Sequence, residues 1–247
     1  MSREISLPEM KALYEPGCGA PSLVLVAGGR APDRAWLCDL CRGEKVWAID
    51  RGIDACLPAG IFPSLFIGDG DSASGYAKKW LAERKTPSLI FPPEKDLTDL
   101  QLALKIMKAD PGGPVIKEAI LTGSFGGRFD HMFANVYSLL WAEEEWSVRV
   151  RCMADDNEAF FIVRGGEKAC FSGLGNNTLI STLSLSPECT GVKTTGTRWP
   201  INNGKLFLNR PYAVSNIVAG AEGVSGSFSV EVRSGWLGVY IFHGKQF

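Results

Sequence analysis

The sequence predicts an α/β domain with a parallel sheet over residues 1–152, followed by an all-β sandwich domain over residues 153–247. In the first part, apolar strand-like runs alternate with segments of helical spacing, and the polar loops follow the strand-like runs. This alternation is typical of a Rossmann-like parallel sheet with right-handed crossovers, whose ligands bind at the carboxyl ends of the strands. Beyond Val150 the helical stripes end, and short β-type runs alternate with turn residues.

The composition predicts a soluble globular protein. The chain has 247 residues, 45% hydrophobic and 21% charged, with a formal net charge of −1. Small molecules or other subunits are the expected partners, rather than nucleic acid. The longest early apolar run, Leu23 to Ala27, is too short to span a bilayer, and the start of the chain has no leader pattern, so a cytoplasmic location is expected. Seven scattered cysteines favour reduced thiols over a disulfide framework.

The first predicted strand covers residues 22–27 and ends in a glycine pair. A helix capped by Asp33 is expected next, carrying Cys38 and Cys41. This cysteine pair could be a zinc half-site or a redox motif. The chain has only two histidines, however, and a redox motif normally opens a helix, so buried free thiols fit better.

A strand is predicted over residues 45–49, and another over residues 64–67 leads directly into Gly68-Asp-Gly-Asp-Ser72. Glycines let the backbone turn sharply, so the carboxylates of Asp69 and Asp71 can converge on a hard cation. The alternative is an ordinary Asp/Gly turn at the end of a strand. Further acidic loops at the same sheet edge would favour the metal site.

A second acidic cluster follows the strand predicted over residues 88–91. Asp96 is expected to cap the next helix, with Asp99 three residues on, so that both carboxylates face the loop of Asp69 and Asp71. The alternative is that Asp96 is a plain N-cap and Asp99 a favourable first-turn acid.

A glycine-rich turn, residues 123–127, follows the strand predicted over residues 118–122, and a helix is expected to begin near Asp130. Amide groups at a helix N-terminus attract phosphate, and Arg128 adds a guanidinium that can grip two phosphate oxygens. The spacing is not that of a Walker loop. His131 is either a ligand contact or a histidine satisfied by local hydrogen bonds.

In the second half, strands are predicted over residues 159–163, 178–183, 205–208 and 236–242. The loop-like segments 196–200 and 214–216 offer an aromatic face with hydroxyl and amide groups, which suit a flat heterocycle. Turn residues and a packed Trp199 are the alternative.

The motifs also match a known pattern. Its first acidic segment corresponds to Ala48-Ile-Asp50 with Gly52 and to Gly60 through Ser72, its second motif to Glu94 through Asp99, and its third to Gly126 through His131 with Asn135. Its β-domain corresponds to Gly196 through Pro200 and Ser215-Asn216. In these four ordered motifs the chain resembles the thiamin pyrophosphokinase family over nearly its full length.

The resemblance implies a homodimer with active sites near the subunit interface, and Mg²⁺-dependent transfer of a pyrophosphoryl group from ATP to thiamin, giving thiamin diphosphate and AMP. Metal ligands would be Asp69, Asp71 and Asp99; catalytic residues would be Asp71, Asp96, Asp99 and Arg128. Nucleotide contacts would come from Asp50, Gly52, Asp69, Ser72, Lys95, Thr98, Gly126, Gly127, Asp130 and His131. Thiamin would be bound by Trp199, Ser215 and Asn216.

The chain departs from the family pattern at three positions: Arg51 where glycine is usual, Gly70 where an aromatic is usual, and Ile217 where an acid often follows Ser-Asn. These departures concern nucleotide or substrate preference rather than the reaction class. Two other hypotheses are a pyrophosphokinase for another hydroxymethyl heterocycle, such as a pterin, and a non-catalytic thiamin-binding protein. The intact acids and Arg128 favour an enzyme.

Overall fold

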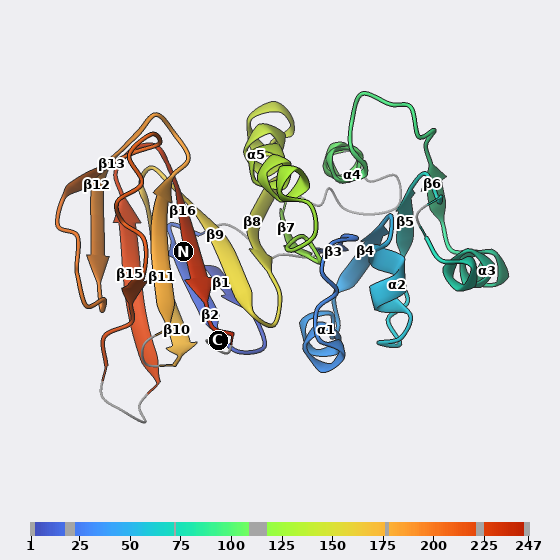
Figure 1. Cartoon of the computed structure of the whole chain (residues 1–247), viewed down its shortest axis with the longest axis horizontal. Coiled ribbons are helices and arrows are strands. Elements are labelled where there is room, and N and C mark those ends of the chain that lie inside the picture. Colours follow the sequence, from blue (N-terminus) through green and yellow to red (C-terminus); the bar gives the residue numbers. More distant parts are fainter. Residues whose placement is uncertain are drawn as a thin grey trace. The chain divides into compact units, whose positions relative to one another are not determined.

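The computed structural model describes residues 3–17, 23–71, 73–108, 118–175, 178–220 and 225–244. The chain forms two compact units (Figure 1). The α/β unit is Pro21–Asp155, and the β unit combines Met1–Ala20 with Asp156–Phe247. No helix in the described ranges is both long and apolar enough to cross a membrane.

The α/β unit is built on six parallel strands in the order β8-β7-β3-β4-β5-β6. The strands are β3 (Leu23–Val26), β4 (Lys45–Ile49), β5 (Leu65–Gly68), β6 (Ser88–Ile90), β7 (Glu118–Thr122) and β8 (Arg149–Ala154). The helices are α1 (Arg34–Leu40), α2 (Gly52–Cys56), α3 (Gly75–Arg84), α4 (Asp99–Met107) and α5 (Phe129–Trp146). Figure 1 shows α4 and α5 on one face of the sheet and α1 and α2 on the other.

The predicted parallel sheet is confirmed, and its cause is visible in the burial of the strands. Every residue of β3 and of β7 is buried, as expected of central parallel strands covered on both faces. The helix α4 buries the stripe Leu100, Ala103, Leu104 and Met107 against this unit. Because the strands run parallel, the loops after β3, β4, β5 and β7 all lie at one edge of the sheet.

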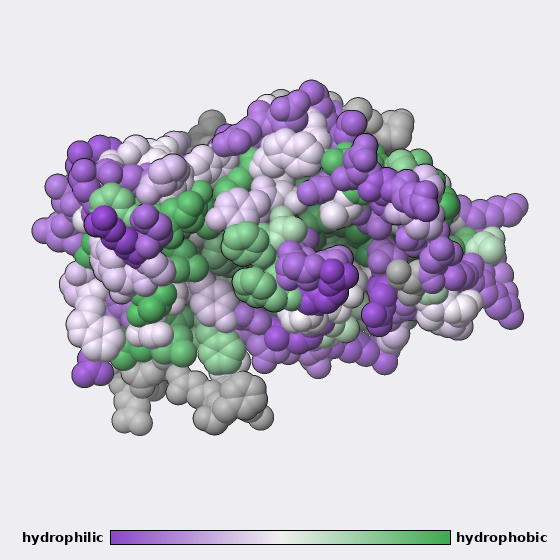
Figure 2. All heavy atoms as spheres, turned by 45° about the horizontal axis from the view of Figure 1, so that its top comes forward, coloured by the Kyte–Doolittle hydropathy of each residue, from purple (hydrophilic) through white to green (hydrophobic). Residues whose placement is uncertain are grey.

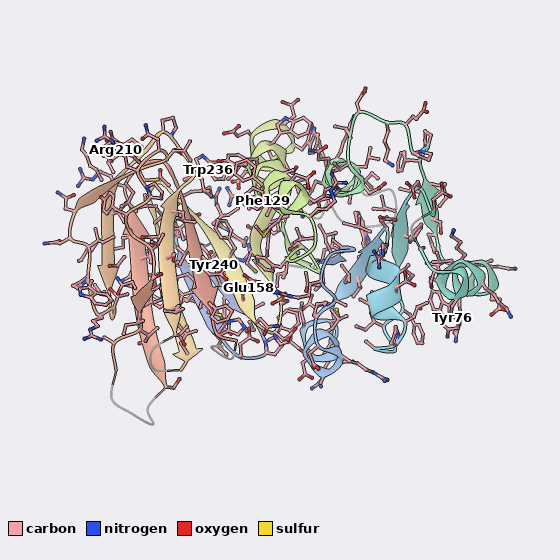
Figure 3. All side chains as sticks on the ribbon, in the orientation of Figure 1. Tyr76, Phe129, Glu158, Arg210, Trp236 and Tyr240 are labelled. Carbon is pink, nitrogen blue, oxygen red and sulfur yellow. The ribbon has the colours of Figure 1, made fainter. Side chains whose placement is uncertain are left out.

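The β unit contains two antiparallel groups of strands, β1-β2-β10-β15-β12-β13 and β14-β11-β16-β9. Their bounds are β1 (Arg3–Ser6), β2 (Lys11–Glu15), β9 (Glu158–Arg164), β10 (Glu167–Leu174), β11 (Leu179–Ser184), β12 (Glu188–Thr195), β13 (Gly204–Phe207), β14 (Asn216–Ile217), β15 (Gly226–Val232) and β16 (Trp236–Phe242). The two groups meet through aromatic rings: the ring centres of Phe161 on β9 and Phe171 on β10 are 5.0 Å apart. Within its own group, Phe171 stacks on Phe228 of β15. On β16, Tyr240 donates a hydrogen bond of 2.5 Å to Glu158 of neighbouring β9 (Figure 3).

The N-terminal boundary differs from the expected domain 1–152, because β1 and β2 belong to the β unit. β2 pairs antiparallel with β10, placing Tyr14 opposite Ala169. Ala12 and Tyr14 are fully buried while Lys11 and Glu15 are exposed, which is the alternation of a half-buried strand. The later boundary, between Asp155 and Asp156, lies three residues beyond the expected 152/153.

Candidate functional site

The first acidic loop forms a tight turn at the end of β5. Asp69 Oδ1 accepts a hydrogen bond of 2.8 Å from the backbone N–H of Asp71, and Gly70 between them has φ +74°, a conformation that favours glycine. Asp71 is exposed. A Cβ at Gly68 would lie 3.2 Å from the Cα of Asp50, so the ends of β4 and β5 are in close contact. Ser72 lies outside the described residues.

The second acidic loop brings a half-buried carboxylate toward the first. Asp99 is the first residue of α4, and its side chain is only 18% exposed. Burial raises the pKa of Asp99; Lys95, with Nζ 3.2 Å from Oδ1, opposes that rise, and the negative charge of Asp69 adds to it. The charges of Asp69 and Asp99 therefore act on each other, as the sequence predicted for the two loops.

These carboxylates fit a hard divalent cation chemically. A cation near Asp69 and Asp99 would relieve their mutual repulsion, and carboxylate oxygens are the ligands that Mg²⁺ prefers. Within the described ranges, however, no three His, Cys, Asp or Glu side chains are already grouped so that they could hold a metal ion. The three-carboxylate set that includes Asp71 is thus not preassembled, and the exposed Asp71 would have to turn toward the other two.

The expectation that Asp96 caps α4 is wrong. The N-cap is Thr98, whose hydroxyl accepts a hydrogen bond from the N–H of Gln101, while the Gln101 side chain accepts one from the N–H of Thr98. This reciprocal capping box satisfies the amides of both Thr98 and Gln101, so the helix begins at Asp99 and needs no cap from Asp96. Asp96 is exposed and lies before the helix, so the argument that it shares a helix face with Asp99 also fails.

The glycine-rich turn lies between β7 and α5, as predicted. Gly123, Gly126 and Gly127 have φ of +64°, +70° and +67°, so three residues of this short turn are in the left-handed region. Helix α5 begins at Phe129, and its N-cap Arg128 makes no side-chain capping bond. A helix N-terminus with amides uncapped by a side chain suits an anion.

Arg128 is paired with a carboxylate in this structure. Its Nε lies 3.1 Å from Asp130 Oδ1, and its terminal nitrogen lies 2.5 Å from Asp130 Oδ2. The pair holds the pKa of Asp130 below and that of Arg128 above its ordinary value. Both side chains and His131 are exposed, as is the neighbouring Phe129 labelled in Figure 3. A phosphate group would therefore compete with Asp130 for the guanidinium.

Sequence reasoning missed the part played by the loop after β3. The N–H of Gly29 donates to Gly123 O and that of Arg30 to Phe125 O, each over 2.7 Å. A Cβ at Gly52 would lie 1.8 Å from Val26 O, so no larger residue fits there. The glycine pair after β3 was the available signal, because close backbone packing between loops requires such residues.

In the β unit the structure brings Trp199 and Asn216 together. The Asn216 amide accepts a hydrogen bond from the Trp199 N–H (3.2 Å) and donates one to the Trp199 carbonyl (2.7 Å). Ser215 has φ +58°, and its N–H donates to Ser181 Oγ. The Trp199 side chain is 58% exposed, so the alternative of a packed tryptophan does not hold; the guanidinium of Arg198 lies 5.1 Å from its ring centre.

The fold and these loops define a two-unit α/β and β protein with an acidic and glycine-rich edge suited to phosphate chemistry. Sequence comparison gives the particular family. The thiamin pyrophosphokinase catalytic-domain model matches residues 41–151, and the thiamin pyrophosphokinase vitamin B1 binding-domain model matches residues 172–235. Together the two models span well over half of the chain, which therefore belongs to the thiamin pyrophosphokinase family.

Individual relatives agree with this assignment. Thiamine pyrophosphokinase of Bacillus subtilis is 29% identical over 198 residues, covering 78% of this chain and 87% of the relative. The crystal structure of thiamine pyrophosphokinase from Bacillus subtilis matches with a TM-score of 0.72 at 22% identity, covering 91% of this chain and 99% of that one. The yeast thiamin pyrophosphokinase structure has the same fold, with a TM-score of 0.68 at 14% identity over 92% of this chain and 88% of that one.

Proposed function

We propose that this chain transfers the pyrophosphoryl group of ATP to the hydroxyl of thiamin, giving thiamin diphosphate and AMP. The observation that carries the proposal is the approach of Asp69 and Asp99 at the carboxyl edge of the parallel sheet, within the segment that matches the catalytic domain. Parallel sheets bind their ligands at this edge.

Asp69, Asp71 and Asp99 are the proposed Mg²⁺ ligands. Bound Mg²⁺ would neutralise negative charge on the phosphate oxygens. Lys95 Nζ lies 3.2 Å from Asp99 Oδ1, so it balances part of the acidic charge and would be able to turn to a phosphate of bound nucleotide. Asp96, exposed and just before α4, is proposed to orient water or accept a proton; loose phosphoryl-transfer transition states need little base catalysis.

The turn of Gly126 and Gly127 and the N-terminus of α5 are the proposed phosphate cradle. Arg128 would exchange Asp130 for phosphate oxygens, which keeps its two-pronged hydrogen bonding and gains a more highly charged partner. The remaining proposed nucleotide contacts are Asp50, Gly52, Ser72, Thr98 and His131. Thr98 would act mainly through the helix that it caps.

Thiamin is proposed to bind at the exposed ring of Trp199. A flat cation is attracted to an aromatic face by about 0.5 to 2 kcal/mol. Ser215 and Asn216 are proposed to bind the pyrimidine edge, and Asn216 also holds the Trp199 backbone in place through its two hydrogen bonds.

A homodimer with active sites near the subunit interface is also proposed. Exposed apolar rings in both units support an association: Phe129 and Phe133 on α5 are 72% and 54% exposed, and Trp199 and Tyr212 are similarly open. Figure 2 shows apolar residues gathered in patches among hydrophilic ones.

The proposed function is tested by AMP release from Mg²⁺-ATP with a panel of acceptors. We expect release with thiamin and none with a hydroxymethylpterin. Release with the pterin alone would mean that the chain is a pyrophosphokinase for another heterocycle. Thiamin binding without AMP release would make it a binding protein.

A further inference from the structure

Arg30, in the loop after β3, lies directly against the glycine turn. Its backbone N–H donates to Phe125 O over 2.7 Å. Its side chain passes along Gly126: a Cβ at Gly126 would lie 2.9 Å from Arg30 Cβ and 3.8 Å from its Cγ and Cδ. Both the backbone and the side chain of Arg30 therefore contact the segment that is the proposed phosphate cradle.

The guanidinium of Arg30 is anchored by a buried carboxylate. Arg30 Nε donates to Asp155 Oδ2 over 2.9 Å, and a terminal nitrogen donates to the same oxygen over 2.5 Å. Asp155 follows β8 and is 0% exposed, whereas the Arg30 side chain is 39% exposed. A buried carboxylate is stable only with its partners in place, so Asp155 favours this placement of the Arg30 guanidinium.

The order of the strands shows which segment the Arg30–Asp155 ion pair crosses. β7 lies between β3 and β8, so a side chain that runs from the loop after β3 to Asp155 after β8 crosses the end of β7. The glycine turn begins at that end. Glycines lose the most conformational entropy when they are ordered, and three of them in the left-handed region make this turn costly to hold.

We propose that Arg30, fixed by Asp155, is a positioning residue that holds the glycine turn 123–127 ready to receive the phosphates of a nucleotide. The inference rests on the proposed function, since it concerns the same phosphate cradle. Arg128 cannot do this task, because its partner Asp130 is two residues away on the same segment and both are exposed. Ordering the turn in advance removes an entropic cost that nucleotide binding would otherwise carry.

The kinetic test compares Arg30→Met with Arg30→Lys, and uses Arg42→Met as the matched control. Arg42 forms an exposed pair with Asp39 at the end of α1, remote in sequence from the turn. We expect Arg30→Met to raise the KM for Mg²⁺-ATP by about tenfold while the KM for thiamin stays within about twofold. Arg30→Lys should recover part of this loss, and Arg42→Met should change neither constant. An unchanged KM for ATP in folded Arg30→Met would overturn the proposal.

Hydrogen exchange supplies a readout that does not depend on activity. Amides of residues 123–128 should exchange faster in Arg30→Met than in Arg42→Met, with the rest of the sheet unchanged. Protection that stays the same, or that falls equally everywhere, would overturn the proposal even if the wild-type protein transfers nothing to thiamin.

A double variant covers the case in which Arg30→Met fails to fold because Asp155 is left charged and buried. Arg30→Met with Asp155→Asn removes both the buried negative charge and the guanidinium that contacts it. It should fold and still show fast exchange at residues 123–128 with a raised KM for ATP. Normal exchange and a normal KM in this double variant would refute the positioning role.

Discussion

Among the individual carboxylates at the carboxyl edge of the parallel sheet, Asp99 has the clearest electrostatic signature. Burial raises its pKa above the ordinary 3.8, so the folded protein binds this proton more tightly than the unfolded chain does. The stabilisation that Asp99 contributes is therefore fully present below its pKa in the unfolded chain, and it is lost as the pH rises through its pKa in the folded protein. Above that pH the Asp99 carboxylate is charged, poorly solvated and repelled by Asp69, and a bound cation would stabilise it.

We predict that Asp99→Asn removes this loss of stability. The melting temperature of the variant, relative to wild type, should increase as the pH rises from 3 to 7, and Mg²⁺ should raise the melting temperature of the wild type only. The ion pair with Lys95 forms only as Asp99 ionises, and its opposing effect is already contained in the raised pKa of Asp99. Thermal unfolding of both proteins with and without Mg²⁺ measures the effect; a difference that is flat with pH would contradict the cause assigned here.

Asp71 is exposed, so its substitution separates chemistry from folding. We predict that Asp71→Asn abolishes AMP release at ordinary Mg²⁺ with a change in unfolding free energy within about 0.5 kcal/mol, as for surface positions generally. Asp39→Asn, an equally conservative change at an exposed acid of α1, is the control. Wild-type turnover in Asp71→Asn would remove Asp71 from the metal site.

At the scale of elements, the cap of α4 positions Asp99. Thr98→Ala deletes the hydroxyl of the capping box and should lower the unfolding free energy by about 1 kcal/mol, whereas Thr98→Ser should retain most of it. Because Asp99 is the first residue of this helix, the Mg²⁺ concentration for half-maximal activity should rise in Thr98→Ala. Urea unfolding and Mg²⁺ titration measure the two effects; equal stability of the alanine and serine variants would show that the hydroxyl is not used.

Elements with a strong local pattern could be predicted from the sequence. The continuous apolar run of β3, the apolar centre of β7 and the stripe of α4 are local signals, and the structure has them where the sequence predicts them. The true cap of α4 also has a local signal, because Thr98 and Gln101 have capping-box spacing, although the acid at Asp96 points to an earlier start of the helix.

Features that depend on distant partners could not be predicted in this way. Arg30 and Asp155 are 125 residues apart, and neither stands in a local pattern. The strands β1 and β2 are short, and only their pairing with β10 assigns them to the β unit. The approach of Asp69 to Asp99 was predictable because it follows from the parallel order of the strands rather than from the side chains themselves.

At the scale of the whole molecule, the proposed functions divide between the units. The acidic loops, the glycine turn and Arg30 belong to the α/β unit, while Trp199, Ser215 and Asn216 belong to the β unit. Substitutions in one unit should therefore affect one substrate. Trp199→Ala should weaken thiamin binding by about 0.5 to 2 kcal/mol through the lost cation–π contact and leave ATP binding unchanged, whereas Asp71→Asn should weaken Mg²⁺-ATP binding alone.

This division leads to a test of the proposed dimer. If each active site uses the α/β unit of one subunit and the β unit of the other, a heterodimer of Asp71→Asn with Trp199→Ala contains one site with both lesions and one with neither. Mixing the two variants should then restore part of the wild-type activity, approaching one quarter of the sites if exchange is random. AMP release before and after exchange, with exchange followed by differently tagged subunits, provides the measurement. Activity that does not exceed that of the separate variants, despite demonstrated exchange, would mean that each site is built within a single chain.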